Sequence, residues 1–173
     1  MFEEMNLRRR QLLRTAALGI AATQFGLFDA ACTQSAQTNP AGAVAAPSPS
    51  FDAIKQVDAG LLNIGYAEAA NGPAAILLHG WPYDIHSFVY VAPLLAANGY
   101  RVVVPHLRGF GTTAFLSSDA FRNAQRSAVA VDLLALMDAL QIDKAIVAGY
   151  DWGARTANIV AALWPERVKA MVR

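Results

Sequence analysis

The sequence predicts an α/β fold with a mostly parallel sheet and helices on both faces. Short continuous apolar runs occur at residues 74–78, 101–105 and 144–148, and such runs are typical of strands buried on both faces. Segments with helical spacing of apolar residues lie between them, and this alternation indicates a parallel sheet covered by helices. Hydrophobic residues make up 55% of the chain and charged residues 16%, which excludes disorder for most of it.

The expected elements follow one another without long gaps. They are strands at 51–58, 61–68, 74–78 and 101–105, a helix near 88–95, a helix near 129–140, a strand at 144–148, a helix at 152–164 and a strand at 169–172. Ala59-Gly60 separates the first two strands. Pro93 suits a helix start and Gly99 a helix end, while Pro165 ends the third helix. The helical spacing is carried by Phe88, Val91 and Leu95, and by Val129, Leu133, Leu136, Met137 and Leu140.

Residues 1–46 predict an export signal with a linker. Residues 7–14 contain four arginines, at 8, 9, 10 and 14. Residues 15–28 carry no charge and are apolar except for Thr15, Thr23 and Gln24, and a basic segment before an apolar one is the secretory pattern. The apolar run is shorter than the roughly 20 residues that span a bilayer, so no stable membrane span is expected. The segment from Arg9 resembles a twin-arginine export signal. An ordinary secretory signal and an uncleaved amphipathic anchor are the alternatives.

The predicted location is therefore outside the bacterial cytoplasm, periplasmic or extracellular, with the export machinery as a partner. Small residues around 43–45 suit cleavage, and Cys32 suggests a lipoprotein site that Asp29 argues against. Residues 33–50 have the composition of a linker. The folded domain is assigned to 47–173.

Charge and cysteine content exclude several partner classes. Residues 47–173 carry ten basic and ten acidic side chains, so nothing favours binding to nucleic acid. The single cysteine and the spacing of the three histidines support neither a disulfide nor a metal site. The glycines at 109 and 111 are too few for a dinucleotide site, and no cofactor is expected.

The segment Gly149-Tyr150-Asp151-Trp152-Gly153 lies where a strand meets a helix. This is the spacing of a nucleophile elbow, in which small residues permit a strained turn that exposes the middle side chain. An Asp at that place attacks a saturated carbon and forms an ester, and water then hydrolyses this ester and regenerates the Asp. A carboxylate beside a helix N-terminus stays ionised. The alternative is that Asp151 only caps the helix.

A second motif, His79-Gly80-Trp81-Pro82, directly follows the 74–78 strand. The backbone N–H groups of Trp81 and Trp152 are expected to form an oxyanion hole for hydrolysis of the ester. His79 is expected to stabilise the turn rather than act as a base.

These motifs, with RVVVPHLRGFG at 101–111 and AGYDWGARTANIVAALWPERV at 148–168, resemble the α/β-hydrolase superfamily. The resemblance covers about residues 51–173 and is to its epoxide hydrolase and haloalkane dehalogenase branch. It implies Asp151 as nucleophile and a small-molecule substrate. Trp81 favours the epoxide side, because haloalkane dehalogenases often carry Asn or Glu there. The Trp152 indole fits either a halide ligand or a pocket wall.

Two further positions bear on the resemblance. Arg155 matches a carboxylate-binding arginine of haloacetate dehalogenases and is equally compatible with a helix surface. His106 stands where the superfamily often has Asp, and either a loop hydrogen bond or solvent exposure would suit it. Arg108, Gly109 and Gly111 are expected to shape the same loop.

In this fold the acid and the histidine follow the nucleophile along the chain. Every histidine here precedes Asp151, and Glu166, the one carboxylate after it, follows the helix-ending proline. We therefore expect this sequence to be the N-terminal half of a hydrolase domain, truncated after about the sixth strand and inactive in turnover, with the cap domain also missing. A dehalogenase is the alternative enzyme. A catalytically dead remnant or a binding domain is the alternative of another class.

Overall fold

A computed structural model describes residues 51 and 53–173. The predicted export signal, its cleavage site, Cys32 and the linker lie outside these described residues, so the expected leader and location stay predictions. Within the described part, no helix is both long and apolar enough to cross a membrane.

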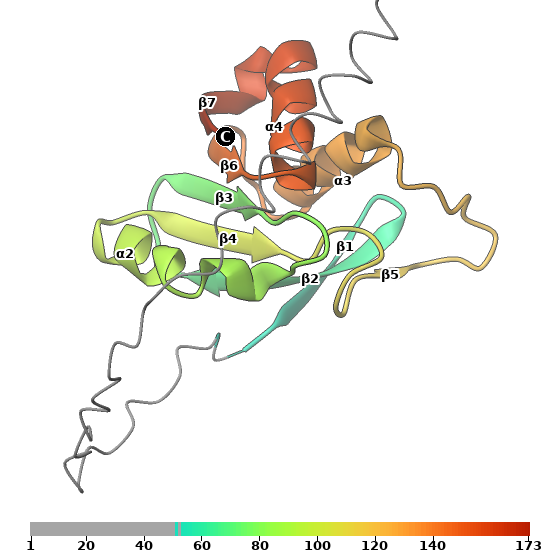
Figure 1. The fold of residues 1–173 in the computed structure, drawn as a ribbon, viewed down its shortest axis with the longest axis horizontal. Coiled ribbons are helices and arrows are strands. Elements are labelled where there is room, and N and C mark those ends of the chain that lie inside the picture. Colours follow the sequence, from blue (N-terminus) through green and yellow to red (C-terminus); the bar gives the residue numbers. More distant parts are fainter. Residues whose placement is uncertain (1–50, 52) are drawn as a thin grey trace, which may run out of the picture. The chain divides into compact units, whose positions relative to one another are not determined.

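The described elements alternate between strands and helices as the sequence predicts (Figure 1). The strands are β1 (Lys55–Ala59), β2 (Leu62–Ala69), β3 (Ala74–Leu78), β4 (Arg101–Pro105), β5 (Ala114–Phe115), β6 (Ala145–Gly149) and β7 (Val168–Val172). The α-helices are α2 (Val91–Ala97), α3 (Arg126–Ala139) and α4 (Trp152–Leu163), and short 3₁₀ helices are η1 (Ile85–Phe88) and η2 (Pro165–Arg167).

The strands form one mixed sheet in the order β1-β2-β4-β3-β6-β7, with β5 paired to β2. The β4-β3, β3-β6 and β6-β7 pairs are parallel, whereas β1-β2, β2-β4 and β2-β5 are antiparallel. All three antiparallel pairs involve β2, so the other strands run in one direction. The predicted α/β class with a mostly parallel sheet is therefore confirmed.

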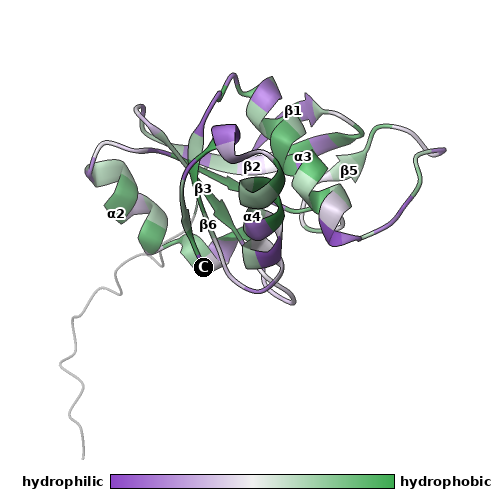
Figure 2. Ribbon diagram, turned by 90° about the horizontal axis from the view of Figure 1, so that it is seen from above, coloured by the Kyte–Doolittle hydropathy of each residue, from purple (hydrophilic) through white to green (hydrophobic). Residues whose placement is uncertain are grey.

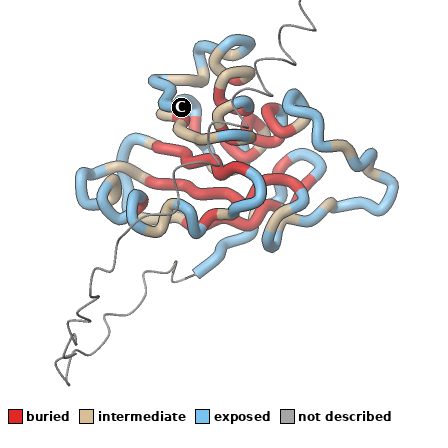
Figure 3. Tube along the Cα trace, viewed as in Figure 1, coloured by how far each residue is buried: buried red, intermediate tan, exposed pale blue. Residues whose placement is uncertain are grey.

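Helices cover both faces of the sheet, with α2 on one side and α3 and α4 on the other (Figure 2). Alternate side chains of β3 divide between the faces: Ile76 and Leu78 pack toward α3 and α4, and Leu77 packs toward α2. The central strands are buried along most of their length (Figure 3). Burial on both faces explains why these strands are uninterrupted apolar runs.

Four expectations about the elements need correction. The helix expected near 88–95 is two elements, because η1 ends at Phe88 and α2 begins at Val91. The first strand begins at Lys55 rather than at residue 51, since only residues 55–59 find partners on β2. The long helix begins at Arg126, three residues before its first buried apolar side chain. The two-residue strand β5 was not expected, because its pairing with Leu62 and Asn63 depends on a distant segment.

Candidate active site

The two predicted motifs meet at the carboxyl edge of neighbouring strands. Strands β3 and β6 pair in parallel, with Leu78 opposite Gly149. The turn that follows β3 and the turn that follows β6 therefore leave the sheet side by side. This arrangement brings Trp81 and Asp151 together although 70 residues separate them.

Asp151 occupies a strained turn at the start of α4. Its backbone has φ 48° and ψ −111°, and its side chain makes no capping hydrogen bond to the helix. Instead, the backbone N–H of Trp81 donates to Asp151 Oδ1 at 3.1 Å. A non-glycine residue at positive φ costs on the order of 1–3 kcal/mol and persists only where its surroundings enforce it. The helix-capping alternative therefore does not account for this side chain.

The environment of Asp151 favours its charged form. The hydrogen bond from the Trp81 amide lowers the pKa of the Asp151 carboxyl most, and the neighbouring Trp152 amide and the charges of Arg155 and Arg126 lower it further. The side chain is exposed to solvent. An exposed carboxylate with a lowered pKa is ionised at neutral pH.

Arg126, which the sequence analysis missed, is with Arg155 one of two arginines whose charges act on this carboxylate. Its guanidinium lies over the Trp152 ring at 5.9 Å from the ring centroid, and its charge acts on Asp151. Arg126 is the first residue of α3, and no spacing in the sequence relates it to position 151. Arg155 is exposed, which fits both interpretations left open for it.

The glycines of both motifs allow backbone and side chains to approach closely. A Cβ at Gly80 would lie 2.7 Å from Asp151 Cβ, and one at Gly149 would lie 2.8 Å from the Leu78 carbonyl oxygen. A Cβ at Gly153 would collide with the same carbonyl group. Gly153 therefore lets α4 start directly against β3. The peptide bond between Trp81 and Pro82 is cis.

Replacing Gly153 by alanine is expected to destabilise the fold. In an ordinary helix this change stabilises by about 1 kcal/mol, but here the added methyl group forces α4 away from Leu78, and overpacking costs about 1–3 kcal/mol. Denaturant unfolding would measure the sign of the change in the free energy of unfolding. Ala162→Gly, at an exposed position of the same helix, measures the contribution of helix propensity alone. A more stable Gly153→Ala variant would contradict the close contact.

His79 joins the first turn to the loop after β4. Its side chain is fully buried. Its Nε2 accepts a hydrogen bond from the Leu107 backbone N–H at 3.1 Å, and its Nδ1 lies 3.1 Å from the Gly80 carbonyl oxygen. Because Nε2 accepts, Nδ1 carries the proton and donates. With both nitrogens engaged, this geometry suits a turn-stabilising role and leaves no nitrogen free to act as a base.

His106 is buried as well, with 5% of its surface exposed, so the solvent-exposed alternative is wrong. Its ring packs against Gly111, where a Cβ would collide with it. Its backbone N–H donates to the Gly65 carbonyl at 2.8 Å and its carbonyl accepts from the Thr113 hydroxyl. Within residues 51 and 53–173, His106 Nδ1 has no hydrogen-bond partner.

The two buried histidines predict a loss of stability in mild acid. Burial lowers the pKa of both His79 and His106, so between these values and about 6.5 the unfolded chain binds more protons than the folded one. The free energy of unfolding should therefore fall as the pH decreases through about 6.5, by at most about 1.4 kcal/mol for each unit by which burial lowers either pKa. Denaturant titrations at several pH values would measure the slope. The slope should be shallower in His106→Asn, and an unchanged slope would contradict the assignment.

An open cavity of about 130 Å³ lies beside the two motifs. It is lined by Trp81, Leu107, Arg108, Phe110, Ala124, Val129 and Trp152. Both tryptophans thus line the cavity, and their backbone amides act on the carboxylate of Asp151. A cavity of this size is comparable to one that holds a benzene-sized group.

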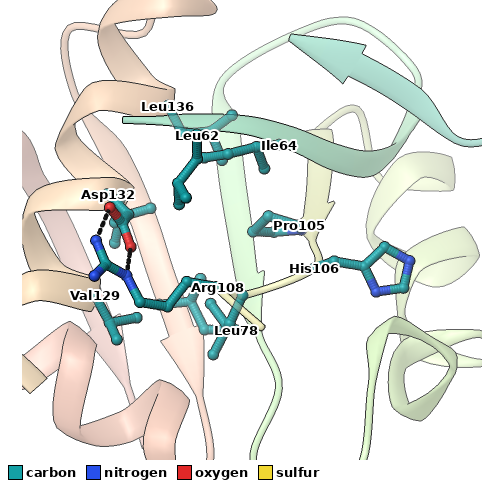
Figure 4. Close-up of a pocket in the computed structure, with 11 residues that line it drawn as sticks. Leu62, Ile64, Leu78, Pro105, His106, Arg108, Val129, Asp132 and Leu136 are labelled. Carbon is teal, nitrogen blue, oxygen red and sulfur yellow. Dashed lines mark hydrogen bonds and ion pairs between the residues drawn. The ribbon is translucent and has the colours of Figure 1, made fainter. Parts of the chain in front are cut away.

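Behind it, the loop after β4 is held by a buried ion pair (Figure 4). Arg108 Nε and Nη2 each lie 2.6 Å from a carboxylate oxygen of Asp132 on α3, and Nη1 donates to the Asn123 carbonyl at 2.8 Å. The adjacent void of about 10 Å³ is the size of one water molecule at most. The His106 ring points away from this void (Figure 4). Arg108 therefore shapes the wall of the larger cavity.

In the described part of the chain, no cluster of three or more His, Cys, Asp or Glu side chains could hold a metal ion.

Comparisons with known proteins agree with this geometry. Residues 73–172 match the family described as "alpha/beta hydrolase fold". The chain is 38% identical over 111 residues to Epoxide hydrolase 2 from Siraitia grosvenorii, covering 64% of this chain and 34% of that protein. It is 36% identical over 116 residues to a fluoroacetate dehalogenase from Burkholderia sp, covering 66% of this chain and 38% of that protein.

Among solved structures, the chain is 62% identical to a Klebsiella pneumoniae protein provisionally named an epoxide hydrolase. The TM-score is 0.69, with 70% of this chain and 41% of that one covered. The chain thus spans a little over a third of the length of the curated relatives that it matches.

Proposed function

Since this chain belongs to the α/β-hydrolase fold family, we propose that it is the part of an epoxide-hydrolase-like enzyme that carries the nucleophile. In this proposal Asp151 attacks a ring carbon of an epoxide and forms a covalent ester. The observation that carries it is the hydrogen bond from Trp81 N–H to Asp151 Oδ1. This bond gives the carboxylate a fixed orientation on an exposed, strained turn.

The hydrogen bond distinguishes the two carboxylate oxygens. Oδ1 accepts from Trp81, so the other oxygen is the one that attacks the epoxide carbon. As the new C–O bond forms, the ring C–O bond breaks and its electron pair moves to the epoxide oxygen, which takes up a proton from the solvent. The product of this step is a hydroxyalkyl ester of Asp151.

Hydrolysis of the ester uses the same two amides. Water adds to the carboxyl carbon of the ester and the carbonyl electron pair moves onto Oδ1. When the tetrahedral intermediate collapses, one proton of that water goes to the departing alkoxide, which leaves as the diol, and the other goes to solvent as the carboxylate is restored. In this proposal the N–H groups of Trp81 and Trp152 stabilise that oxyanion. One such donor is typically worth about 10²–10³ in rate.

The cavity beside Trp81 and Trp152 suits the apolar substituent of the substrate. Its lining is mostly aromatic and aliphatic, and its volume matches a group the size of a phenyl ring. We therefore choose styrene oxide as the probe for the proposed reaction.

The test is incubation of the full chain with styrene oxide, followed by intact-mass measurement and peptide mapping. We expect either a stable adduct of the epoxide mass on the peptide containing Asp151, or, where the ester turns over in H₂¹⁸O, ¹⁸O in the Asp151 carboxylate. Labelling confined to other residues, or no labelling of the folded chain, would refute the proposal and favour a binding domain or a catalytically dead one.

A dehalogenase is the second candidate. The cationic charges of Arg155 and Arg126 act on Asp151, and they would offset the repulsion between this carboxylate and an anionic haloacetate. The carboxylate would attack the carbon that bears the halogen and the halide would leave with the bonding electron pair. Carboxymethylation of Asp151 by fluoroacetate or chloroacetate with stoichiometric halide release, and no labelling by styrene oxide, would favour this candidate.

A further inference from the structure

Two hydrogen bonds, not one, connect the turn after β3 to the nucleophile turn. Besides the Trp81–Asp151 contact, the Tyr150 hydroxyl lies 2.7 Å from the Ser87 hydroxyl. Ser87 belongs to η1, which begins three residues after Pro82, the end of the His79–Pro82 motif. The side chain that precedes the nucleophile is therefore bonded to the end of the segment that supplies the amide.

The ring of Tyr150 also supports this segment by contact. A Cβ at Gly80 would lie 2.8 Å from Tyr150 Cε2, so the backbone next to Trp81 rests close to the ring. Phe88, also in η1, packs against the same ring at 5.9 Å between centroids in a tilted arrangement. The ring thus lies between Gly80 and η1.

The backbone of Tyr150 is held by the elements on either side. Its N–H lies 3.4 Å from the Leu78 carbonyl oxygen of β3, and its carbonyl accepts from Gly153 N–H of α4 at 2.9 Å. Tyr150 is thereby a fixed point from which its hydroxyl can hold the more exposed η1 segment.

We propose that Tyr150 is a positioning residue which, through Ser87, holds the Trp81 amide on the carboxylate of Asp151. This inference rests on the proposed function, because an amide that fixes the orientation of the Asp151 carboxylate affects the reaction only if Asp151 is the nucleophile. The strained backbone of Asp151 needs such external support. A displacement of about 1 Å in a catalytic contact can cost on the order of 10²-fold in rate.

The first test compares the rates at which styrene oxide labels Asp151. Tyr150→Phe and Ser87→Ala each remove one hydroxyl and leave the packing in place. Each should lower the saturating labelling rate by about 10- to 100-fold with little change in the half-saturating concentration. The double variant should be no slower than either single variant. Ser87→Thr, which keeps the hydroxyl, should restore the rate, and Tyr90→Phe, at an exposed tyrosine, is the matched control.

The second test does not depend on reactivity. In the wild type the Trp81 amide proton resonance should shift as Asp151 titrates, because the amide donates to that carboxylate. In Tyr150→Phe this shift should be smaller and the pKa of Asp151 higher, with Arg126 and Arg155 unchanged in both proteins. A merely structural role for Tyr150 would lower the melting temperature without changing this titration.

The outcomes separate the two proposals. One outcome is that the wild type is not labelled while the Trp81 amide resonance still responds less to the titration of Asp151 in Tyr150→Phe than in the wild type. In that case the proposed function fails, but Tyr150 is still shown to hold the Trp81 amide against Asp151. If the wild type is labelled and both Tyr150→Phe and Ser87→Ala keep its rate and its amide titration, the positioning role is refuted.

Discussion

Replacing Asp151 by alanine is expected to abolish labelling of the chain by styrene oxide, with a loss of more than about 10³-fold in rate. The two amides and the cavity remain in this variant, but no other carboxylate occupies the turn. Asp151→Asn should be similarly unreactive at short times, because the neutral amide keeps the shape and lacks the nucleophilic charge. Intact-mass kinetics on the folded proteins would measure both losses.

The matched control is Asp143→Ala, at an exposed aspartate that precedes β6, which should label at the wild-type rate. Asp151→Gly should be unreactive and also more stable than the wild type by about 1 kcal/mol, because glycine adopts φ 48° without strain. Persistent labelling of Asp151→Ala at the wild-type rate would place the reaction at another residue.

Replacing Arg108 by methionine is expected to destabilise the chain by about 3–5 kcal/mol. Arg108 and Asp132 are both largely buried, with 6% and 11% of their side chains exposed. The variant leaves the Asp132 carboxylate without the two hydrogen bonds that it accepts and leaves the Asn123 carbonyl without its donor. Denaturant unfolding would measure the loss. The dependence of the unfolding free energy on denaturant concentration should be the same in the variant and the wild type.

A double variant distinguishes the cost of an unpaired charge from the value of the pair. Arg108→Met with Asp132→Leu removes both charges, and it should recover most of the stability that Arg108→Met loses. A double variant as unstable as the single one would mean that the ion pair is needed for the geometry of the loop after β4. The wall of the cavity beside Trp152 would then depend on this ion pair.

Most elements of the fold could be predicted because their signals are local. The runs at 74–78 and 101–105 coincide with β3 and β4, since strands buried on both faces need apolar side chains at every position. The start of β1 and the whole of β5 could not be predicted in this way. Their limits depend on which residues of β2 are available for pairing, and no pattern within the segments themselves carries that information.

By itself the sequence determined the α/β class and the turn that presents Asp151, because the glycines at 149 and 153 and the apolar runs around them act over a few residues. Only the tertiary structure decided what surrounds that carboxylate. The amide of Trp81, the charge of Arg126 and the hydroxyl pair of Tyr150 and Ser87 meet across as many as 70 residues of chain. The physical reason is that parallel pairing of β3 with β6 creates these neighbours, and a hydrogen bond between distant segments leaves no periodic trace in either.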